Sequence, residues 1–286
     1  MTAGPNHQRL RIRHTKLGRT RYLSARDLTS VWERSLRRAQ LPIAYSQGFT
    51  PHAKVSFPDA LPVGLASTGE YAELSFAAPI DPGPGLGSLS AALPEGMTIT
   101  TYLEVPDGAP KLAKMLRSTL WELAWPAADV DEAEALAARG SAAVDALLAL
   151  DHHEITKHRP SGDKVVDIRP PIIRAAMQVA PRPAWIDAGM PTSDRSPSGA
   201  SAAPDPGVAT ILRVLLRNGG ATVRPPDLVT ALAQVMPDDL EPLPDTRHAC
   251  RVAQGAVTEE GCKEALTGQV ERLVLDAAAE LSLIHI

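Results

Sequence analysis

Cysteine, aromatic residues and long apolar runs are all scarce in this chain, and each scarcity excludes a class of protein. Only two cysteines occur, Cys250 and Cys262, and the eleven residues between them fit neither a Cys-x-x-Cys metal knuckle nor a disulfide framework. We therefore expect two unpaired thiols in a reducing compartment. No stretch approaches the roughly 20 apolar residues of a membrane span, and the N-terminus lacks the apolar core of a signal peptide. The cytoplasm is the expected location, with no membrane partner.

The chain does have enough apolar material for two folded lobes. Its 286 residues, 44% hydrophobic and 22% charged, have the composition of an ordinary globular protein. We expect a disordered segment over residues 1–8, a first lobe over 9–108 and a second over 112–280. A Pro-, Ser- and Gly-rich stretch near 190–206 predicts a disordered insert. We interpret residues 281–286 as a sequencing artefact and exclude them from the fold.

Positive charge is concentrated in the first fifth of the chain. Residues 9–57 hold eleven Lys or Arg against two acids, a local net charge of +9 in a chain whose formal net charge is −4. The remainder therefore carries −13. A positive block of this density is typical of a surface that binds polyanions such as RNA.

The first lobe has the element order β-α-β-β-α-β. Residues 9–15 alternate basic and apolar side chains with period two, which predicts a strand. Ser24 and Asp27 have the spacing of a capping box, which predicts a helix from 25 to about 40. Further strands are expected over 43–45, 54–57, 70–76 and 97–105, with a helix near 86–93. This is the order of a ferredoxin-like α+β sandwich, whose second sheet face we expect to be open for binding.

The second lobe is also predicted to be α+β. The patterns indicate a strand over 120–125, helix over 130–150, a hairpin of 154–157 with 164–168, strands over 177–180 and 209–217, and helices over 227–235 and 259–280. The sequence leaves open whether this lobe is a degenerate repeat of the first.

Arginines mark one side of the first predicted helix. At 100° per residue, Leu28, Trp32 and Leu36 project to one side, whereas the arginines project roughly opposite. These arginines are Arg26, Arg34, Arg37 and Arg38. We read no acid between them, which is unusual for an ordinary solvated helix face and favours polyanion binding.

The loop at 45–54 completes the candidate binding site. Gly48 permits a positive φ, Tyr45 or Phe49 could stack on a base, and His52 could contact phosphate. The alternative is a tight hairpin in which Tyr45, Phe49 and Phe57 belong to the core. The candidate binding residues are Lys16, Arg19, Arg21, Arg34, Arg37, Arg38, Tyr45, Ser46, Gln47, Gly48, Phe49, His52 and Lys54.

Catalytic and metal-binding signals are weak. His52 is the one candidate general base, but no Gly-x-Ser-x-Gly nucleophile turn accompanies it. His153 and His158 lack the i, i+4 spacing of a helical zinc site, so a solvated turn is the preferred interpretation. Asp167 and Arg169 are secondary candidates, either as a structural ion pair that holds a loop or as substrate contacts. We expect no metal or cofactor in this chain.

The first lobe resembles the radical-SAM-linked family of bacterial proteins. The resemblance is carried by Lys16-x-Gly18-x-x-Arg21-Tyr22-Leu23-Ser24, Arg34-x-x-Arg37-Arg38, Tyr45-Ser46-Gln47-Gly48-Phe49-x-Pro51-His52 and Leu61-Pro62-Val63-Gly64. It implies an accessory role beside a separately encoded radical SAM enzyme. This chain lacks Cys-x-x-x-Cys-x-x-Cys, so the iron-sulfur cluster and S-adenosylmethionine would belong to that partner. Ala25 stands where family members often have His, so no histidine role is carried over.

Three functions remain open at this point. The leading hypothesis is a non-catalytic RNA-binding or substrate-presenting accessory protein that works with a radical SAM enzyme in RNA modification. The second is a stand-alone enzyme, ribonuclease-like or acting on a small anion, with a site at 47–52 together with Ser67 and Glu70. The third is a protein-interaction module, because carboxylates on a partner require arginines similar to those that phosphates require.

Overall fold

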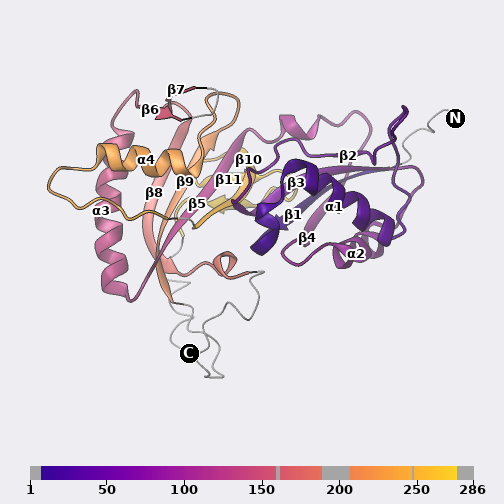
Figure 1. The fold of residues 1–286 in the computed structure, drawn as a ribbon, viewed down its shortest axis with the longest axis horizontal. Helices are drawn as coiled ribbons and strands as arrows, with labels where there is room; N and C mark the ends of the chain where they lie inside the picture. Colours follow the sequence, from indigo (N-terminus) through magenta and orange to yellow (C-terminus); the bar gives the residue numbers. More distant parts are fainter. Residues whose placement is uncertain (1–7, 159–161, 189–206, 247, 276–286) are drawn as a thin grey trace, which may run out of the picture. The chain divides into compact units, whose positions relative to one another are not determined.

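The computed structural model describes residues 8–158, 162–188, 207–246 and 248–275. Four helices and twelve strands occur within these residues (Figure 1). In chain order the elements are β1 (Gln8–Lys16), η1 (Gly18–Tyr22), α1 (Ala25–Arg38), β2 (Val55–Ser56), β3 (Ala66–Phe76), α2 (Pro82–Ala92), β4 (Ile99–Glu104), η2 (Leu112–Lys114), β5 (Ser118–Ala127), α3 (Val130–Leu148), β6 (Glu154–Lys157), β7 (Lys164–Asp167), β8 (Ile172–Pro181), η3 (Ala184–Ile186), β9 (Val208–Arg217), α4 (Pro225–Val235), β10 (His248–Val257), β11 (Gly261–Glu264) and β12 (Val270–Arg272).

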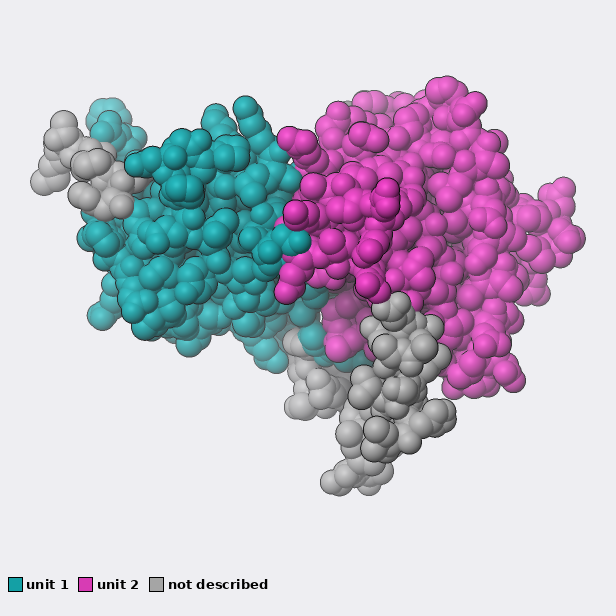
Figure 2. Space-filling view, turned by 180° about the vertical axis from the view of Figure 1, so that it is seen from behind, with its two compact units in different colours: residues 1–116, 187–195, 265–268 teal, residues 117–186, 196–264, 269–286 magenta. Residues whose placement is uncertain are grey.

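Three sequence predictions concern residues that lie outside the described ones. They are residues 1–7 of the disordered segment expected over 1–8, the insert near 190–206 and the artefact at 281–286. Gln8, the last residue of that expected segment, is instead the first residue of β1. The remaining residues form two compact units, coloured separately in Figure 2. Unit 1 comprises residues 1–116, 187–195 and 265–268, and unit 2 comprises the rest.

Unit 1 has the predicted ferredoxin-like topology. Its elements follow the order β1-α1-β2-β3-α2-β4, and its strands lie in the order β4-β1-β3-β2. Every pair in this sheet is antiparallel. The expected strand at 43–45 is reduced to two isolated bridges, Ile43 with Phe76 and Tyr45 with Ala53.

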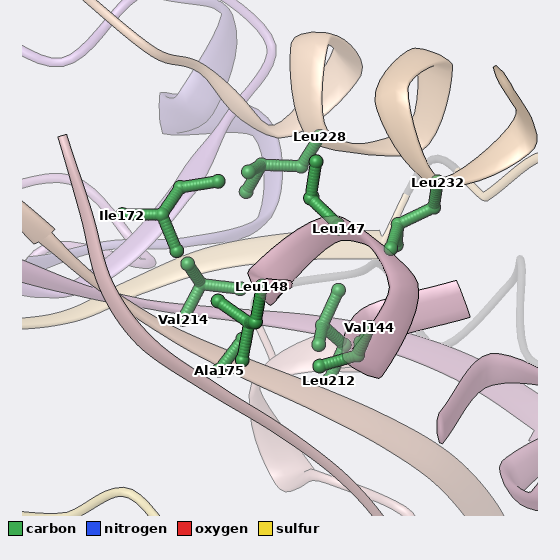
Figure 3. Close-up of a pocket in the computed structure, with 9 residues that line it drawn as sticks. All are labelled: Val144, Leu147, Leu148, Ile172, Ala175, Leu212, Val214, Leu228 and Leu232. Carbon is green, nitrogen blue, oxygen red and sulfur yellow. The ribbon is translucent and has the colours of Figure 1, made fainter. Parts of the chain in front are cut away.

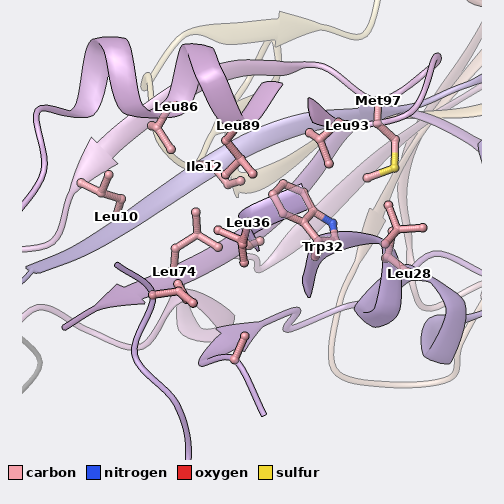
Figure 4. Packing of buried hydrophobic residues seen from close by; sticks show 14 of the residues in the cluster. Leu10, Ile12, Leu28, Trp32, Leu36, Leu74, Leu86, Leu89, Leu93 and Met97 are labelled. Atoms are coloured by element: carbon pink, nitrogen blue, oxygen red, sulfur yellow. The ribbon is translucent and has the colours of Figure 1, made fainter. Parts of the chain in front are cut away.

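The core of unit 1 follows from the alternation and periodicity of its sequence. Leu10 and Ile12 of β1 alternate with exposed or paired arginines and point at the helices. Trp32 of α1 is fully buried and projects into the middle of the cluster (Figure 4). Large apolar side chains that are fully buried contribute about 1.5–3 kcal/mol each, so this face of α1 holds the helix to the sheet. The opposite face of α1 is left to solvent.

Helix α1 begins and ends where local chemistry predicts. The Ser24 hydroxyl accepts a hydrogen bond from the Asp27 backbone N–H, and the Asp27 carboxylate accepts one in return from the Ser24 backbone. The hydrogen bond from the Ser24 side chain is the main reason that the pKa of Asp27 is lowered. After Arg38 the chain turns at Gln40, whose φ is +54°, and Pro42 cannot continue the helix.

Unit 2 repeats the topology of unit 1. Its main elements follow the order β5-α3-β8-β9-α4-β10, again β-α-β-β-α-β, and the strands lie in the order β10-β5-β9-β8. All these pairs are antiparallel, as in unit 1. The β6–β7 hairpin, between α3 and β8, occupies the place in the order that residues 43–54 occupy between α1 and β2. The second lobe is therefore a repeat of the first at the level of topology.

The C-terminal helix predicted over 259–280 is wrong for the described part of that range. Residues 261–264 form β11 and residues 270–272 form β12, and the strand β10 before them was not predicted. Gly261 explains the difference. A Cβ atom at this position would collide with the backbone carbonyl of Glu271, so the glycine allows the two strands to approach closely. Pairing with β10 outweighs the helical periodicity of this segment.

The sheet face opposite the helices is not the open surface that the topology suggested. In unit 1, Arg11 is 2% exposed and its guanidinium contacts the Glu73 carboxylate at 2.9 Å and the backbone of Pro110. In unit 2 the equivalent cross-strand pair has the opposite polarity, with Glu122 on β5 and Arg213 on β9 at 2.7 Å. Both pairs are largely buried, so these strand charges neutralise each other inside each unit and do not face solvent.

None of the described helices is long and apolar enough to cross a membrane.

Candidate nucleic-acid interface

The exposed face of α1 carries the densest unpaired positive charge of the candidate site. Its four arginines are all exposed: Arg26, Arg34, Arg37 and Arg38. Within the described residues, none of their guanidinium groups forms an ion pair or a hydrogen bond. They contrast with Arg9 and Arg11 of β1, which share the Glu73 carboxylate. Fewer basic residues of the segment 9–57 therefore face solvent than the sequence suggests.

Two acids lie on this face, contrary to our interpretation of the sequence. Asp27 is exposed seven residues before Arg34, and its pKa is lowered by hydrogen bonds from Ser24 and further by the charges of Arg26 and Arg34. Glu33 is seven residues after Arg26 and four before Arg37, which places it between them on the helix surface. Its carboxylate contacts the His52 imidazole at 3.4 Å, so Glu33 joins the loop to the helix.

The loop is a small hairpin that extends beyond the sheet. Tyr45 pairs with Ala53, the Ser46 N–H donates to the His52 carbonyl at 2.8 Å, and the Ser46 hydroxyl accepts from the His52 N–H at 3.0 Å. These bonds close the loop at its base. Gln47, Gly48 and the residues that follow are exposed, and Gly48 has φ +136°, a conformation that other residues rarely adopt.

The three aromatic residues of this region have different environments. Phe49 at the hairpin tip is 110% exposed relative to a reference residue, and Tyr45 at its base is 44% exposed. Phe57 instead packs against Trp32, with ring centroids 6.0 Å apart. The core interpretation therefore holds for Phe57 and fails for Phe49, because the tip of the closed hairpin extends away from the sheet.

The basic residues before α1 also separate into buried and exposed ones. Lys16 is 1% exposed and its ammonium donates to the Leu23 carbonyl at 3.1 Å, which contradicts a phosphate contact at the surface. Arg19 is exposed. Arg21 is half-buried and its guanidinium lies over the Tyr22 ring, 5.2 Å from the centroid. Lys54 is half-buried next to the hairpin.

The proposed small-molecule site around His52 is not assembled as expected. Ser67 and Glu70 are buried in β3, whereas residues 47–52 are exposed. The His52 side chain is 66% exposed, and its neighbour Ser46 uses its hydroxyl to close the loop. A general base gains most of its effect in a site that excludes water, and this loop does not provide one.

Asp167 and Arg169 hold a loop in unit 2. The Asp167 carboxylate and the Arg169 guanidinium do not form an ion pair with each other. The Asp167 carboxylate accepts from the His152 ring at 2.6 Å and from the backbone N–H groups of His153 and Arg169. The guanidinium of Arg169 donates to the carbonyls of Ile172 and Leu148. Both residues are therefore structural anchors of the β6–β7 region.

The pKa values at this anchor follow from the same bonds. The hydrogen bond from His152 to Asp167 raises the pKa of His152, and the Asp167 charge adds to the effect. Partial burial tends to raise the pKa of Asp167, but the hydrogen bonds from His152 and the two backbone N–H groups outweigh it and leave that pKa lowered.

Two cavities among the described residues of unit 2 do not have the form of an enclosed ligand site. An aliphatic cavity of about 10 Å³ lies between α3, α4 and the sheet, lined by Val144, Leu147, Leu228 and other apolar side chains (Figure 3). A cavity of this size and lining stays dry. A wider groove of about 480 Å³ is open and contains Lys157, whose ammonium already contacts Asp227 at 2.6 Å. Cys250 on β10 and Cys262 on β11 are buried thiols.

Comparison with known proteins assigns most of the chain to an uncharacterised bacterial family. A sequence model of the family described as "Uncharacterized protein conserved in bacteria (DUF2344)" matches residues 9–225. The chain belongs to this family. The match includes α1, the hairpin and most of unit 2. A search of curated proteins found no match.

Proposed function

We propose that this member of the family is an RNA-binding accessory protein that presents its substrate to a separately encoded enzyme. The interface consists of the α1 arginines with Arg19 and the hairpin at 45–53. No metal or cofactor is assigned to the chain.

The observation that carries the proposal is the contrast in how arginines are used. Inside unit 1, Arg11 is neutralised by a carboxylate, whereas the guanidinium groups of the four α1 arginines face solvent and form no close ion pair or hydrogen bond among the described residues. Unpaired guanidinium groups on one face repel each other, so the arrangement costs stability unless an anion binds there. Phosphate groups provide that anion at a regular spacing, and each contact releases a counterion.

We infer the partner from the resemblance of the sequence motifs to radical-SAM-linked proteins. The motifs shared with radical-SAM-linked proteins include Arg34, Arg37 and the hairpin, which are also the interface residues. We therefore propose that the partner is a radical SAM enzyme, which carries the iron-sulfur cluster and S-adenosylmethionine, and that the substrate is an RNA to be modified.

Two experiments test the two parts separately. In the first, a filter-binding titration with total cellular RNA is run at increasing salt, and we expect affinity that falls steeply with salt concentration. RNA binding that is absent, or that does not respond to salt, rejects the RNA-binding part. In the second, the chain is mixed with a radical SAM enzyme encoded beside it and analysed by size-exclusion chromatography. Failure to form a complex rejects the partner and leaves the RNA-binding part intact.

One observation favours a lesser alternative. The His52–Glu33 contact resembles a base held by a carboxylate, which would suit a ribonuclease-like enzyme. If the chain is such an enzyme, His52→Ala should abolish RNA cleavage and leave RNA affinity nearly unchanged. Wild-type protein that binds RNA without cleaving it rules this alternative out.

A further inference from the structure

Aromatic residues are distributed very unevenly between buried and exposed positions. All four tryptophans are at most 8% exposed. The four exposed aromatic residues all lie in unit 1: Tyr22 at 60%, Tyr45 at 44%, Phe49 at 110% and Tyr102 at 45%. In a chain with only 4% aromatic residues, three of these exposed rings lie next to α1 or in the hairpin that contacts it. An exposed phenylalanine at a loop tip contributes nothing to the core, which leaves its ring free to stack on a ligand.

Tyr22 is held in a defined orientation. The Arg21 guanidinium lies 5.2 Å from the centre of its ring and donates to its hydroxyl at 3.1 Å. The Arg21 carbonyl in turn accepts from the Gly64 N–H at 2.8 Å, which fixes the backbone at this point. One side of the ring is thus covered by a cation while the residue remains 60% exposed. A planar ring fixed in this way can accept a base on its free side at low entropic cost.

Phe49 lies at the tip of a hairpin that contacts the same helix. The hairpin is closed by Ser46 and His52, and His52 is joined to Glu33 of α1. Tyr22 precedes the first residue of α1 by three positions, and Glu33 lies eight residues further along the helix. The hairpin therefore contacts α1 about 12 Å along the helix axis from its first residue, whereas Tyr22 lies just before that residue.

We infer that the interface selects single-stranded RNA, with one unstacked base on Tyr22, a second on Phe49 and the intervening phosphates on the α1 arginines. The inference rests on the proposed RNA-binding function and specifies its substrate class. Duplex RNA keeps its bases stacked inside the helix, so neither ring could reach a base face. Tyr22 was not among the residues that the sequence predicted for the site.

The test compares three fluorescent probes of equal length: a mixed-sequence single strand of about 12 nucleotides, its duplex, and an abasic strand with the same phosphates. Binding is measured by fluorescence anisotropy with the full chain. We expect Tyr22→Ala and Phe49→Ala each to weaken binding of the single strand about ten-fold. Binding of the abasic strand and the duplex should change less than about two-fold, since the phosphate contacts remain.

Tyr102→Ala is the matched control. Tyr102 is 45% exposed in the same unit, but it lies on β4, at the sheet edge opposite β2. Its removal should leave all three affinities unchanged. Phe49→Trp should keep the affinity and lose tryptophan fluorescence when the single strand binds, but not when the abasic strand binds. All three positions are exposed, and thermal unfolding midpoints verify that the four variants are folded.

The outcomes separate this inference from the function on which it rests. If the wild-type chain binds none of the three probes, both are overturned. If it binds RNA in a salt-dependent way but Tyr22→Ala and Phe49→Ala behave like Tyr102→Ala, only base stacking is overturned. Equal losses on the single strand and the abasic strand also overturn stacking, because they show that the rings act through the backbone.

Discussion

Removal of the α1 arginines should change the salt dependence of RNA binding by a predictable amount. Each phosphate that a protein neutralises on a single strand contributes about −0.7 to the slope of log K against log salt. With the four α1 arginines and Arg19 engaged, the slope is about −3.5, which corresponds to a loss of affinity of about 130-fold between 50 and 200 mM salt. The triple variant Arg34→Gln, Arg37→Gln and Arg38→Gln leaves Arg19 and Arg26. Its slope should be about −1.4, with a loss of only about seven-fold over the same range.

A second triple variant controls for net charge. Lys164→Gln, Arg217→Gln and Lys263→Gln remove the same three charges from exposed positions of unit 2. Its slope should remain that of the wild type, because these residues lie outside the proposed interface. The measurement is an anisotropy titration at four or more salt concentrations. An unchanged slope in the α1 variant, or an equal reduction in the unit 2 variant, would show that the effect is one of net charge and would refute the assignment to α1.

Three further predictions concern stability and titration. Arg213→Met should lower the free energy of unfolding by about 3–5 kcal/mol in chemical denaturation, because it leaves the buried Glu122 carboxylate without its cation. Gly96→Ala should cost more than about 2 kcal/mol, since φ is +89° and a Cβ atom would collide with a backbone carbonyl. Asp167→Asn should move the pKa of His152 down towards its ordinary value of 6.5, as measured by NMR titration of the ring protons.

Each of these three has its own check. The double variant Glu122→Gln with Arg213→Met should be more stable than Arg213→Met alone; equal stabilities would show that the unpaired charge is not the cause. Gly108 also has a positive φ, of +76°, but open space around it, so Gly108→Ala should cost only about 1 kcal/mol. A similar cost at both glycines would disprove the collision.

The pH dependence of the third prediction follows from the direction of each shift. The raised pKa of His152 contributes stability that is complete below 6.5 and is lost as the pH rises through the raised value. The lowered pKa of Asp167 contributes stability above 3.8 that is lost as the pH falls through the lowered value. The stability difference between wild type and Asp167→Asn should therefore be largest between these two limits. A difference that is constant from pH 4 to 9 would contradict the ion pair.

Local signals in the sequence were sufficient to predict most of the architecture. The capping box at Ser24 and Asp27, the alternation in residues 9–15 and the helical period around Trp32 depend on neighbours in the chain, and all three are present in the structure. The β-α-β-β-α-β order of the first lobe could be predicted from the sequence because each of its elements has such a local signal. The strands within residues 259–275 could not be predicted from local signals. Its pairing depends on β10 and on the close approach at Gly261, neither of which is a local property.

The sequence by itself determined where the positive charge lies along the chain and which loop accompanies it. Only the tertiary structure decided which charges reach solvent. It buried Lys16, paired Arg9 and Arg11 with Glu73, and left the α1 arginines exposed. It also turned Phe49 outwards while Phe57 packed on Trp32. The physical reason is that accessibility depends on which strands and loops cover a residue, and that covering is set by contacts between segments far apart in the chain.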